Sequence, residues 1–246
     1  MKITCLGSGG YYATNDTHTI CFMIPELGII IDAGTGLFRA IDLVKTENLH
    51  IFITHPHSDH TTGLAYLNLF YKKTSVKNIF IHASEFTLST INNIFKPPFI
   101  GSPLKYTPAI FNTDSIKLFD NVVVSRFPVH HSVECYGYHF NFGDRSLAFI
   151  TDTCSNESSE YAQCVDHSNL LIHECYLPDS KVDPHPKKPL AHTSSSGLIE
   201  FCKKANITNV CFIHHNPDGY KNQILEEVRK GIKNVCAAND QESYEI

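Results

Sequence analysis

Residues 51–60, IFITHPHSDH, constrain this chain more than any other segment. An apolar run leads directly into four side chains that can bind a metal ion, namely His55, His57, Asp59 and His60. The apolar run predicts a buried strand, and in an extended segment His55 and His57 point to the same side. A hydrophobic core gains nothing from such a polar cluster, because burying polar groups without partners costs free energy. The segment therefore predicts a metal-binding loop at a strand end.

Further candidate ligands follow other apolar runs that have the pattern of strands. Ligands of open sheets bind at the carboxyl ends of strands, so this placement indicates a shared site. A lone histidine is more often structural, but that interpretation does not explain a whole set at strand ends. Imidazole and carboxylate groups suit zinc, and manganese or iron accept the same ligands. These candidates are His130, His131, Asp152, His173, Glu174, His192, His214 and His215.

Short apolar segments alternate with helical patterns along the chain, which predicts packed sheets with helices outside. Residues 95–110 hold four prolines and little periodicity, so we expect an irregular loop there, with a lid as one interpretation. Helices are expected at 63–73, 84–95, 157–166, 194–205 and 221–234. Strands are expected at 2–7, 19–24, 29–34, 50–54, 78–83, 115–119, 122–129, 136–142, 146–152, 169–174 and 209–215.

Composition and charge exclude several classes of protein. A chain of 246 residues with 42% hydrophobic and 18% charged residues is a folded domain rather than a disordered or coiled-coil protein. The net charge is −5 and no stripe of lysine and arginine occurs, so long nucleic acid is not an expected partner. Neither a signal peptide nor a membrane span is expected. Nine cysteines without a C-x-x-C motif predict reduced thiols in the cytoplasm.

The pattern His55-x-His57-x-Asp59-His60 after a strand resembles the signature of the metallo-β-lactamase superfamily. The earlier segment IIIDAG, with Asp32, is similar to the strand-Asp-x-Gly element of that family. The resemblance extends from LGSGG to FIHHNPD, which is nearly the whole chain. It implies an α/β (α+β) fold in which residues 1–246 form a single domain. That fold is a four-layer αββα sandwich, with two mixed β-sheets flanked by helices.

The resemblance also implies a centre of two divalent metal ions, with zinc as the expected metal. His131 is preferred to His130 because relatives place a Gly-Tyr pair six residues after the ligand, as Gly137 and Tyr138 stand here. His214 is preferred to His215 because strands of the family end directly on the ligand. Both choices stay open. The implied ligands are His55, His57 and His131 for one ion, Asp59, His60 and His214 for the other, and Asp152 between them.

Within the superfamily, LLIHE (170–174) and AHTSSS (191–196) resemble elements of the ribonuclease Z-like phosphodiesterases. The resemblance implies three catalytic residues. His192 would contact the phosphate or protonate the leaving oxygen, Glu174 would orient His192, and Asp59 would orient the attacking water. Ribonuclease Z enzymes carry a long basic arm between the third histidine motif and the bridging aspartate. Only 21 positions separate His131 from Asp152, which favours a small phosphate ester such as a cyclic nucleotide over transfer RNA.

Three other functions stay open. A thioester or other acyl hydrolase of the same superfamily would need the same ligands but would have no evident use for His192. A ribonuclease Z-like endonuclease would process the 3′ ends of RNA. A metal-stabilised binding protein would keep the fold without catalysis. The resemblance also allows a homodimer.

Overall fold

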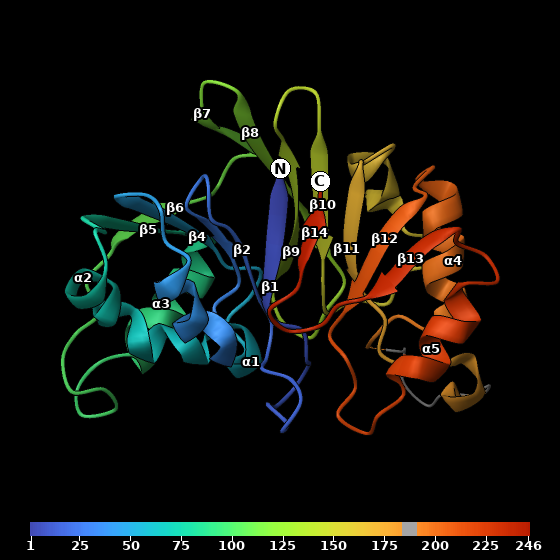
Figure 1. Ribbon diagram of the computed structural model, residues 1–246, viewed down its shortest axis with the longest axis horizontal. Coiled ribbons are helices and arrows are strands. Elements are labelled where there is room, and N and C mark those ends of the chain that lie inside the picture. Colours follow the sequence, from blue (N-terminus) through green and yellow to red (C-terminus); the bar gives the residue numbers. More distant parts are fainter. Residues whose placement is uncertain (184–190) are drawn as a thin grey trace. The chain divides into compact units, whose positions relative to one another are not determined.

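The computed structural model describes residues 1–183 and 191–246, and the chain divides into two compact units. Unit 1 comprises residues 1–112 and 239–245, and unit 2 comprises residues 113–238 together with Ile246. Among the described residues, each unit holds one mixed sheet of seven strands with helices beside it (Figure 1). The expectation of two mixed sheets flanked by helices is therefore confirmed. That residues 1–246 form a single domain stays a prediction.

The sheet of unit 1 has the strand order β14-β1-β2-β3-β4-β5-β6. The pairs from β14 to β3 are antiparallel, and the pairs from β3 to β6 are parallel. Its strands are β1 (Lys2–Gly7), β2 (Cys21–Ile24), β3 (Ile29–Ile31), β4 (Asn48–Phe52), β5 (Asn78–Ala83), β6 (Thr107–Ile110) and β14 (Ser243–Glu245). Its helices are η1 (Thr35–Asp42), α1 (Ser58–Thr61), η2 (Thr62–Leu69), α2 (Phe70–Lys73) and α3 (Glu85–Ile94).

The sheet of unit 2 has the order β13-β12-β11-β10-β9-β8-β7 and repeats the same sequence of pairings. The pairs from β7 to β10 are antiparallel, and those from β10 to β13 are parallel. Its strands are β7 (Ser115–Phe119), β8 (Val122–Val129), β9 (Cys135–Asn141), β10 (Ser146–Ile150), β11 (Leu170–Glu174), β12 (Asn209–Ile213) and β13 (Asn234–Ala237). Its helices are η3 (Glu160–Val165), η4 (Asp179–Lys181), α4 (Ser195–Lys204) and α5 (Lys221–Val228).

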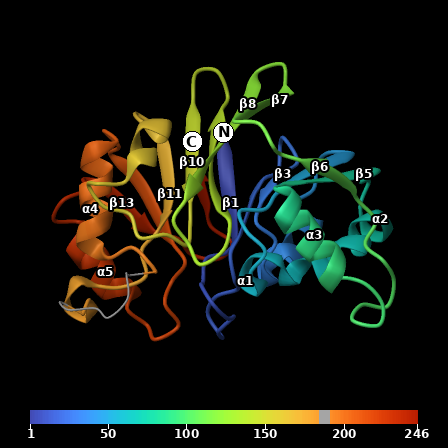
Figure 2. The same ribbon diagram turned by 180° about the vertical axis from the view of Figure 1, so that it is seen from behind.

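Each unit buries its own hydrophobic core between its sheet and its helices. In unit 1, Ile51 of β4 and Ile81 of β5 pack in one cluster with Leu64 of η2. In unit 2, Leu171 of β11 and Phe201 of α4 share the corresponding cluster. Figure 2 shows α3 beside the sheet of unit 1, and α4 and α5 beside that of unit 2. Parallel strands covered in this way are apolar without interruption, as LLI in β11 is.

The expected strands form, although their ends differ by a few residues, and three further strands were missed. β6 lies within the segment interpreted as an irregular loop, and it contains Pro108. Proline is tolerated there because β6 is the edge strand of its sheet. The helix expected at 221–234 is wrong in its second half, since α5 ends at Val228 and Asn234 begins β13. In residues 1–183 and 191–246, no helix has the length and apolar character needed to cross a membrane.

Candidate metal centre

The candidate ligands of unit 1 converge in the loop after β4 and in the short helix α1. His55 and His60 are fully buried, and Asp59 is nearly so. The Nε2 atom of His55 lies 3.0 Å from Nδ1 of His57, and Nε2 of His60 lies 3.3 Å from Oδ2 of Asp59. Burying several imidazoles and a carboxylate this closely is costly unless a cation is shared among them. This donor set fits a divalent metal ion.

Asp32 positions two of these side chains from the end of β3. Its Oδ2 accepts a hydrogen bond from Nδ1 of His60 at 2.8 Å, and its Oδ1 accepts the Thr54 backbone N–H at 2.8 Å. The Thr54 hydroxyl donates to Asp32 and lies 3.0 Å from Nδ1 of His55. Burial raises the pKa of Asp32, whereas His60 and Thr54 act to lower it. A carboxylate bound to Nδ1 in this way leaves Nε2 of His60 as the nitrogen that could bind a metal ion.

The turn after Asp32 also fixes α1 by close backbone contact. The Ala33 N–H donates to the His60 carbonyl oxygen at 2.8 Å, and the Gly63 N–H donates to the Ala33 carbonyl oxygen at 2.8 Å. A Cβ atom at Gly34 would come within 2.4 Å of the Asp59 carbonyl oxygen. Only glycine permits this approach, so the D-A-G sequence holds α1, with the candidate ligands Asp59 and His60, close to the end of β3.

Replacing Asp32 with asparagine should weaken zinc binding by about 10- to 100-fold, because the amide presents a donor to Nδ1 of His60 and loses the orienting bond. Calorimetric titration of the metal-free protein with zinc measures this change. Asp42→Asn, at an exposed position of η1, is the matched control and should bind zinc like the unmodified chain. Equal affinities for the Asp32 and Asp42 variants would show that Asp32 does not position His60.

The candidate ligands of unit 2 meet at Asp152, just after β10. Its Oδ1 lies 3.3 Å from Nε2 of His214 and 3.9 Å from Nε2 of His131, and all three side chains are at least nine-tenths buried. The Thr151 hydroxyl donates to Asp152 Oδ2 at 2.7 Å and fixes the carboxylate. Asp152 and His214 both have positive φ, 52° and 59°. Such backbone strain in residues other than glycine is concentrated at functional sites.

The sequence left open which residue of each adjacent histidine pair is the candidate ligand, and the surroundings of these residues differ in the structure. His131 approaches Asp152, whereas the neighbouring His130 is exposed and lines a pocket. His214 approaches Asp152, whereas Nε2 of His215 lies 2.7 Å from the carbonyl oxygen of Ala238. The geometry therefore favours His131 and His214, and their assignment as ligands remains a proposal.

His192 and Glu174 form a hydrogen-bonded pair beside His214. Nδ1 of His192 lies 2.9 Å from Oε2 of Glu174, whose side chain is fully buried. The His192 ring stacks on Tyr176 and on His214, with centroids 4.4 and 5.2 Å apart. Ligand atoms of Glu174, His192 and His214 all lie within 4.8 Å of one another. With Nδ1 directed at a carboxylate, Nε2 is the nitrogen that can exchange a proton with a substrate.

Sequence reasoning missed the polar residues that hold this pair in place. The Thr193 hydroxyl donates to the Thr153 carbonyl oxygen at 2.6 Å and accepts the Ser155 N–H at 2.9 Å. The Thr153 N–H in turn donates to Oε1 of Glu174. The sequence TSSS at residues 193–196 could have indicated these contacts, because threonine and serine side chains commonly form hydrogen bonds with nearby backbone groups.

His173 was a candidate in the sequence, but its contacts are structural. Its Nε2 lies 2.7 Å from the Ser155 hydroxyl, and its Nδ1 lies 2.6 Å from the carbonyl oxygen of Glu174. Burial lowers the pKa of His173 to about 4. With both ring nitrogens in hydrogen-bond contact, His173 supports the end of β11 next to Glu174.

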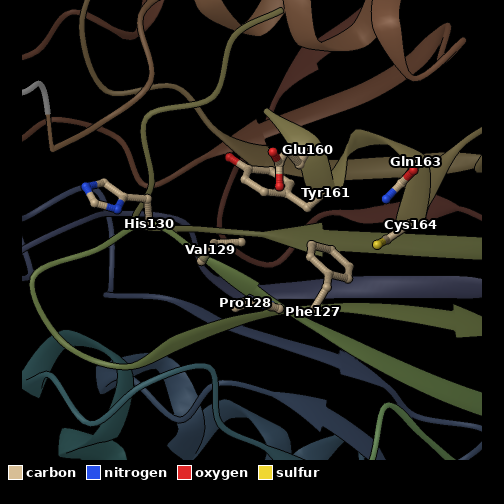
Figure 3. A pocket seen from close by; sticks show the side chains of 8 residues that line it. All are labelled: Phe127, Pro128, Val129, His130, Glu160, Tyr161, Gln163 and Cys164. Atoms are coloured by element: carbon tan, nitrogen blue, oxygen red, sulfur yellow. The ribbon is translucent and has the colours of Figure 1, made fainter. Parts of the chain in front are cut away.

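A pocket of about 490 Å³ lies between β8 and η3, as Figure 3 shows. The rings of Phe127 and Tyr161 stack there with centroids 5.8 Å apart. The Tyr161 hydroxyl lies 2.7 Å from that of Ser155, which links the pocket wall to the polar network around His192. The lining residues are Phe127, Pro128, Val129, His130, Glu160, Tyr161, Gln163 and Cys164.

Comparison with known proteins gives one family and several relatives. The family model described as beta-lactamase superfamily domain matches residues 28–215. Ribonuclease Z of Pyrococcus abyssi is 27% identical over 292 aligned residues, which cover 96% of this chain and 92% of the relative. Ribonuclease Z of Thermococcus sibiricus is 28% identical, with 59% of this chain and 49% of the relative covered. Exodeoxyribonuclease YycJ of Bacillus anthracis is 30% identical, with 52% and 47% covered. The chain spans about half the length of the latter two.

Solved structures show the same fold at lower sequence identity. The metallo-beta-lactamase fold protein YhfI from Bacillus subtilis matches with a TM-score of 0.81 and 16% identity, covering 99% of both chains. A diphosphatase from the PhnP family matches with a TM-score of 0.73 and 21% identity, covering 100% of this chain and 97% of the other. Zn(2+)-bound PqqB from Methylobacterium extorquens matches with a TM-score of 0.72 and 15% identity, covering 100% of both.

Proposed function

Since this chain belongs to the metallo-β-lactamase superfamily and to its ribonuclease Z-like branch, we propose that it is a phosphodiesterase with two divalent metal ions. The coarser activity, metal-dependent hydrolysis, follows from the family and from the clusters of histidine and aspartate. The small phosphodiester, the number of ions and the roles of single residues belong to the proposal.

The ligands of the proposed centre come from the strand ends described above. His55, His57, Asp59 and His60 would contribute from unit 1, and His131, Asp152 and His214 from unit 2. That both sets hold one pair of ions is inferred from the family. Zinc is the proposed metal, because nitrogen and carboxylate ligands suit it and a related fold binds it in PqqB. Bound divalent ions activate water at neutral pH and neutralise phosphoryl oxygens.

The residues of this chain supply the remaining steps of the proposed reaction. Asp59 orients the attacking water and can accept its proton. His192 donates a proton from Nε2 to the leaving oxygen, and Glu174 holds the ring by its bond to Nδ1. A diester would be cleaved to a monoester and an alcohol, with water adding its oxygen to phosphorus.

One observation carries the phosphodiesterase proposal, namely the His192–Glu174 pair next to His214. An alkoxide leaving group needs a proton, and a histidine backed by a carboxylate is suited to provide it. A thiolate leaves more readily without such help, so a thioester hydrolase has little use for the pair. The pair therefore favours an oxygen ester of phosphate.

Charge and chain length favour a small substrate, such as a cyclic nucleotide, over long RNA. Between His131 and Asp152 the chain forms β9, a turn and β10, with no further arm. The net charge of −5 opposes binding of a polyanion. The likeness to a diphosphatase of the PhnP family is consistent with a small phosphate ester.

A second candidate is a ribonuclease Z-like endonuclease that processes the 3′ ends of RNA. The match to ribonuclease Z of Pyrococcus abyssi, which covers 92% of that protein, favours it. Cleavage of a transfer RNA precursor by the purified chain, with no turnover of small diesters, would replace the first proposal by this one.

The proposal is tested with bis(p-nitrophenyl) phosphate and a thioester, using protein whose metal content has been measured. We expect diester turnover that disappears on chelation, returns with about two zinc ions per chain, and is lost in Asp59→Ala. Hydrolysis of the thioester alone would indicate the acyl hydrolase. Two bound ions without turnover of any ester would indicate a binding protein.

A further inference from the structure

Tyr11 combines a strained backbone with an exposed aromatic ring in the loop between β1 and β2. Its φ is 67°, a left-handed conformation that a tyrosine rarely adopts. Its side chain is 71% exposed, so the ring adds little to the hydrophobic core. Tyr12 beside it is also exposed, and the two rings meet edge to face with centroids 5.4 Å apart. Neither the strain nor the exposure helps the fold.

The base of the loop that carries Tyr11 is fixed by hydrogen bonds. Asp240 accepts the Ser8 N–H at 2.9 Å through Oδ1 and the His18 N–H at 2.8 Å through Oδ2. Arg39 pairs with the same carboxylate. The Gly9 N–H donates to the His18 carbonyl oxygen at 2.9 Å. Contacts on both arms of the loop therefore fix its base.

The tip is bound directly to a candidate metal ligand. The Tyr11 backbone N–H donates to Oδ2 of Asp59 at 2.9 Å. The same oxygen lies 3.3 Å from Nε2 of His60. The left-handed backbone of Tyr11 thus serves to place this N–H on Asp59 while its ring stays in solvent. Strain of this kind persists where function requires it.

We propose that Tyr11, supported by Tyr12, forms a stacking platform that holds a planar ring of the substrate beside Asp59. This inference rests on the proposed phosphodiesterase and names its substrate class, namely diesters that carry a nucleobase or a comparable aromatic ring. A base stacks on an exposed aromatic ring without a need for specific hydrogen bonds. We therefore expect the platform to favour substrates that carry any planar aromatic ring, without preference for one particular nucleobase.

The Tyr11→Gly variant distinguishes the contribution of the ring from that of the backbone N–H. Tyr11→Gly removes the ring but adopts φ of 67° without strain, so the bond to Asp59 is kept. Tyr11→Asn, which also tolerates this conformation, is the second variant, and Tyr11→Phe keeps the ring. Tyr66→Ala removes another exposed tyrosine of unit 1 and is the matched control. Circular dichroism and zinc content establish that each variant is folded and loaded.

The kinetic test compares adenosine cyclic monophosphate with the cyclic phosphate of glycerol, which has no nucleobase or other aromatic ring. In Tyr11→Gly and Tyr11→Asn we expect KM for the adenosine substrate to rise about 5- to 100-fold, the range of one lost stacking contact, with kcat little changed. Turnover of the glycerol substrate should change by less than about twofold, because no stacking contact is lost. Tyr11→Phe and Tyr66→Ala should match the unmodified protein. Equal losses on both substrates, or no loss on either, would overturn the platform.

A binding measurement keeps this test independent of turnover. Adenosine monophosphate and ribose phosphate are titrated calorimetrically into the zinc-loaded protein. Tighter binding of the adenosine compound, lost in Tyr11→Gly and kept in Tyr11→Phe, supports the platform even if no diester is hydrolysed. In that case the phosphodiesterase proposal would be rejected, and the stacking platform of Tyr11 and Tyr12 would be kept. Equal binding of the two compounds overturns the platform while leaving the diesterase proposal untouched.

Discussion

Replacing Asp152 with alanine is expected to lower phosphodiester turnover on the order of 1000-fold or more, because this carboxylate is the proposed bridge between two metal ions that activate water. Its Oδ1 lies within 4 Å of Nε2 in both His131 and His214. Asp152→Asn keeps the shape of the side chain and removes its charge, and we expect it to bind fewer zinc ions. Steady-state kinetics and metal analysis of both variants measure the effect.

Asp144→Asn is the matched control, since Asp144 is exposed in the turn that joins β9 to β10, the strand preceding Asp152. It should keep both the metal content and the turnover of the unmodified chain. If Asp152→Asn retained two zinc ions and turned over the diester within about tenfold of the unmodified rate, Asp152 could not be a bridging ligand, because loss of even an outer contact typically costs that much.

Replacing His192 with alanine is expected to slow the cleavage of an alkyl phosphodiester by about 10²- to 10⁴-fold, the usual contribution of a general acid. The loss should be much smaller with a p-nitrophenyl ester, because p-nitrophenolate leaves without protonation. Glu174→Gln should give an intermediate loss with the alkyl ester, since it disturbs the partner of Nδ1. Comparing kcat for the two esters in each variant measures the difference.

The dependence on the leaving group distinguishes the roles considered for His192. Equal losses with both esters would mean that His192 binds the phosphate and does not donate a proton. Unchanged rates with both would show that His192 neither binds the phosphate nor donates a proton, and would remove the observation that favours a phosphodiester over a thioester. His167→Asn provides the control, because His167 is exposed, lies outside the site, and has a positive φ that asparagine tolerates.

The sequence predicted the parts of the site that depend on local spacing. His55, His57, Asp59 and His60 lie within six residues, so one strand end and one helical turn suffice to gather them. The choice between His130 and His131 was different, because neighbouring residues share the same strand end. It became clear only from the surroundings of each side chain, because His131 approaches Asp152 whereas His130 is exposed. Adjacent positions of an extended chain face opposite sides, and the sequence does not state which side carries the site.

The parts that were missed depend on distant residues. β6 and β13 are edge strands that form by pairing with β5 and β12, and neither has a strong pattern of its own. The role of Asp32 follows from its bond to His60, a partner 28 positions away. The conformation of Tyr11 follows from contacts to Asp59. Propensity and periodicity describe neighbours along the chain, so they do not reveal these long-range contacts.

The repeated order of strand pairings gives the chain two equivalent positions at which an aspartate follows the central strand. In each sheet, β3 or β10 is the strand where antiparallel pairing changes to parallel pairing. Asp32 and Asp152 come just after these strands, with φ of 55° and 52°. Duplication of a half-size ancestor followed by divergence would leave this pattern. In such a history, Asp152 would have become the proposed metal ligand, and Asp32 would have been kept to orient His60 through its bond to Nδ1.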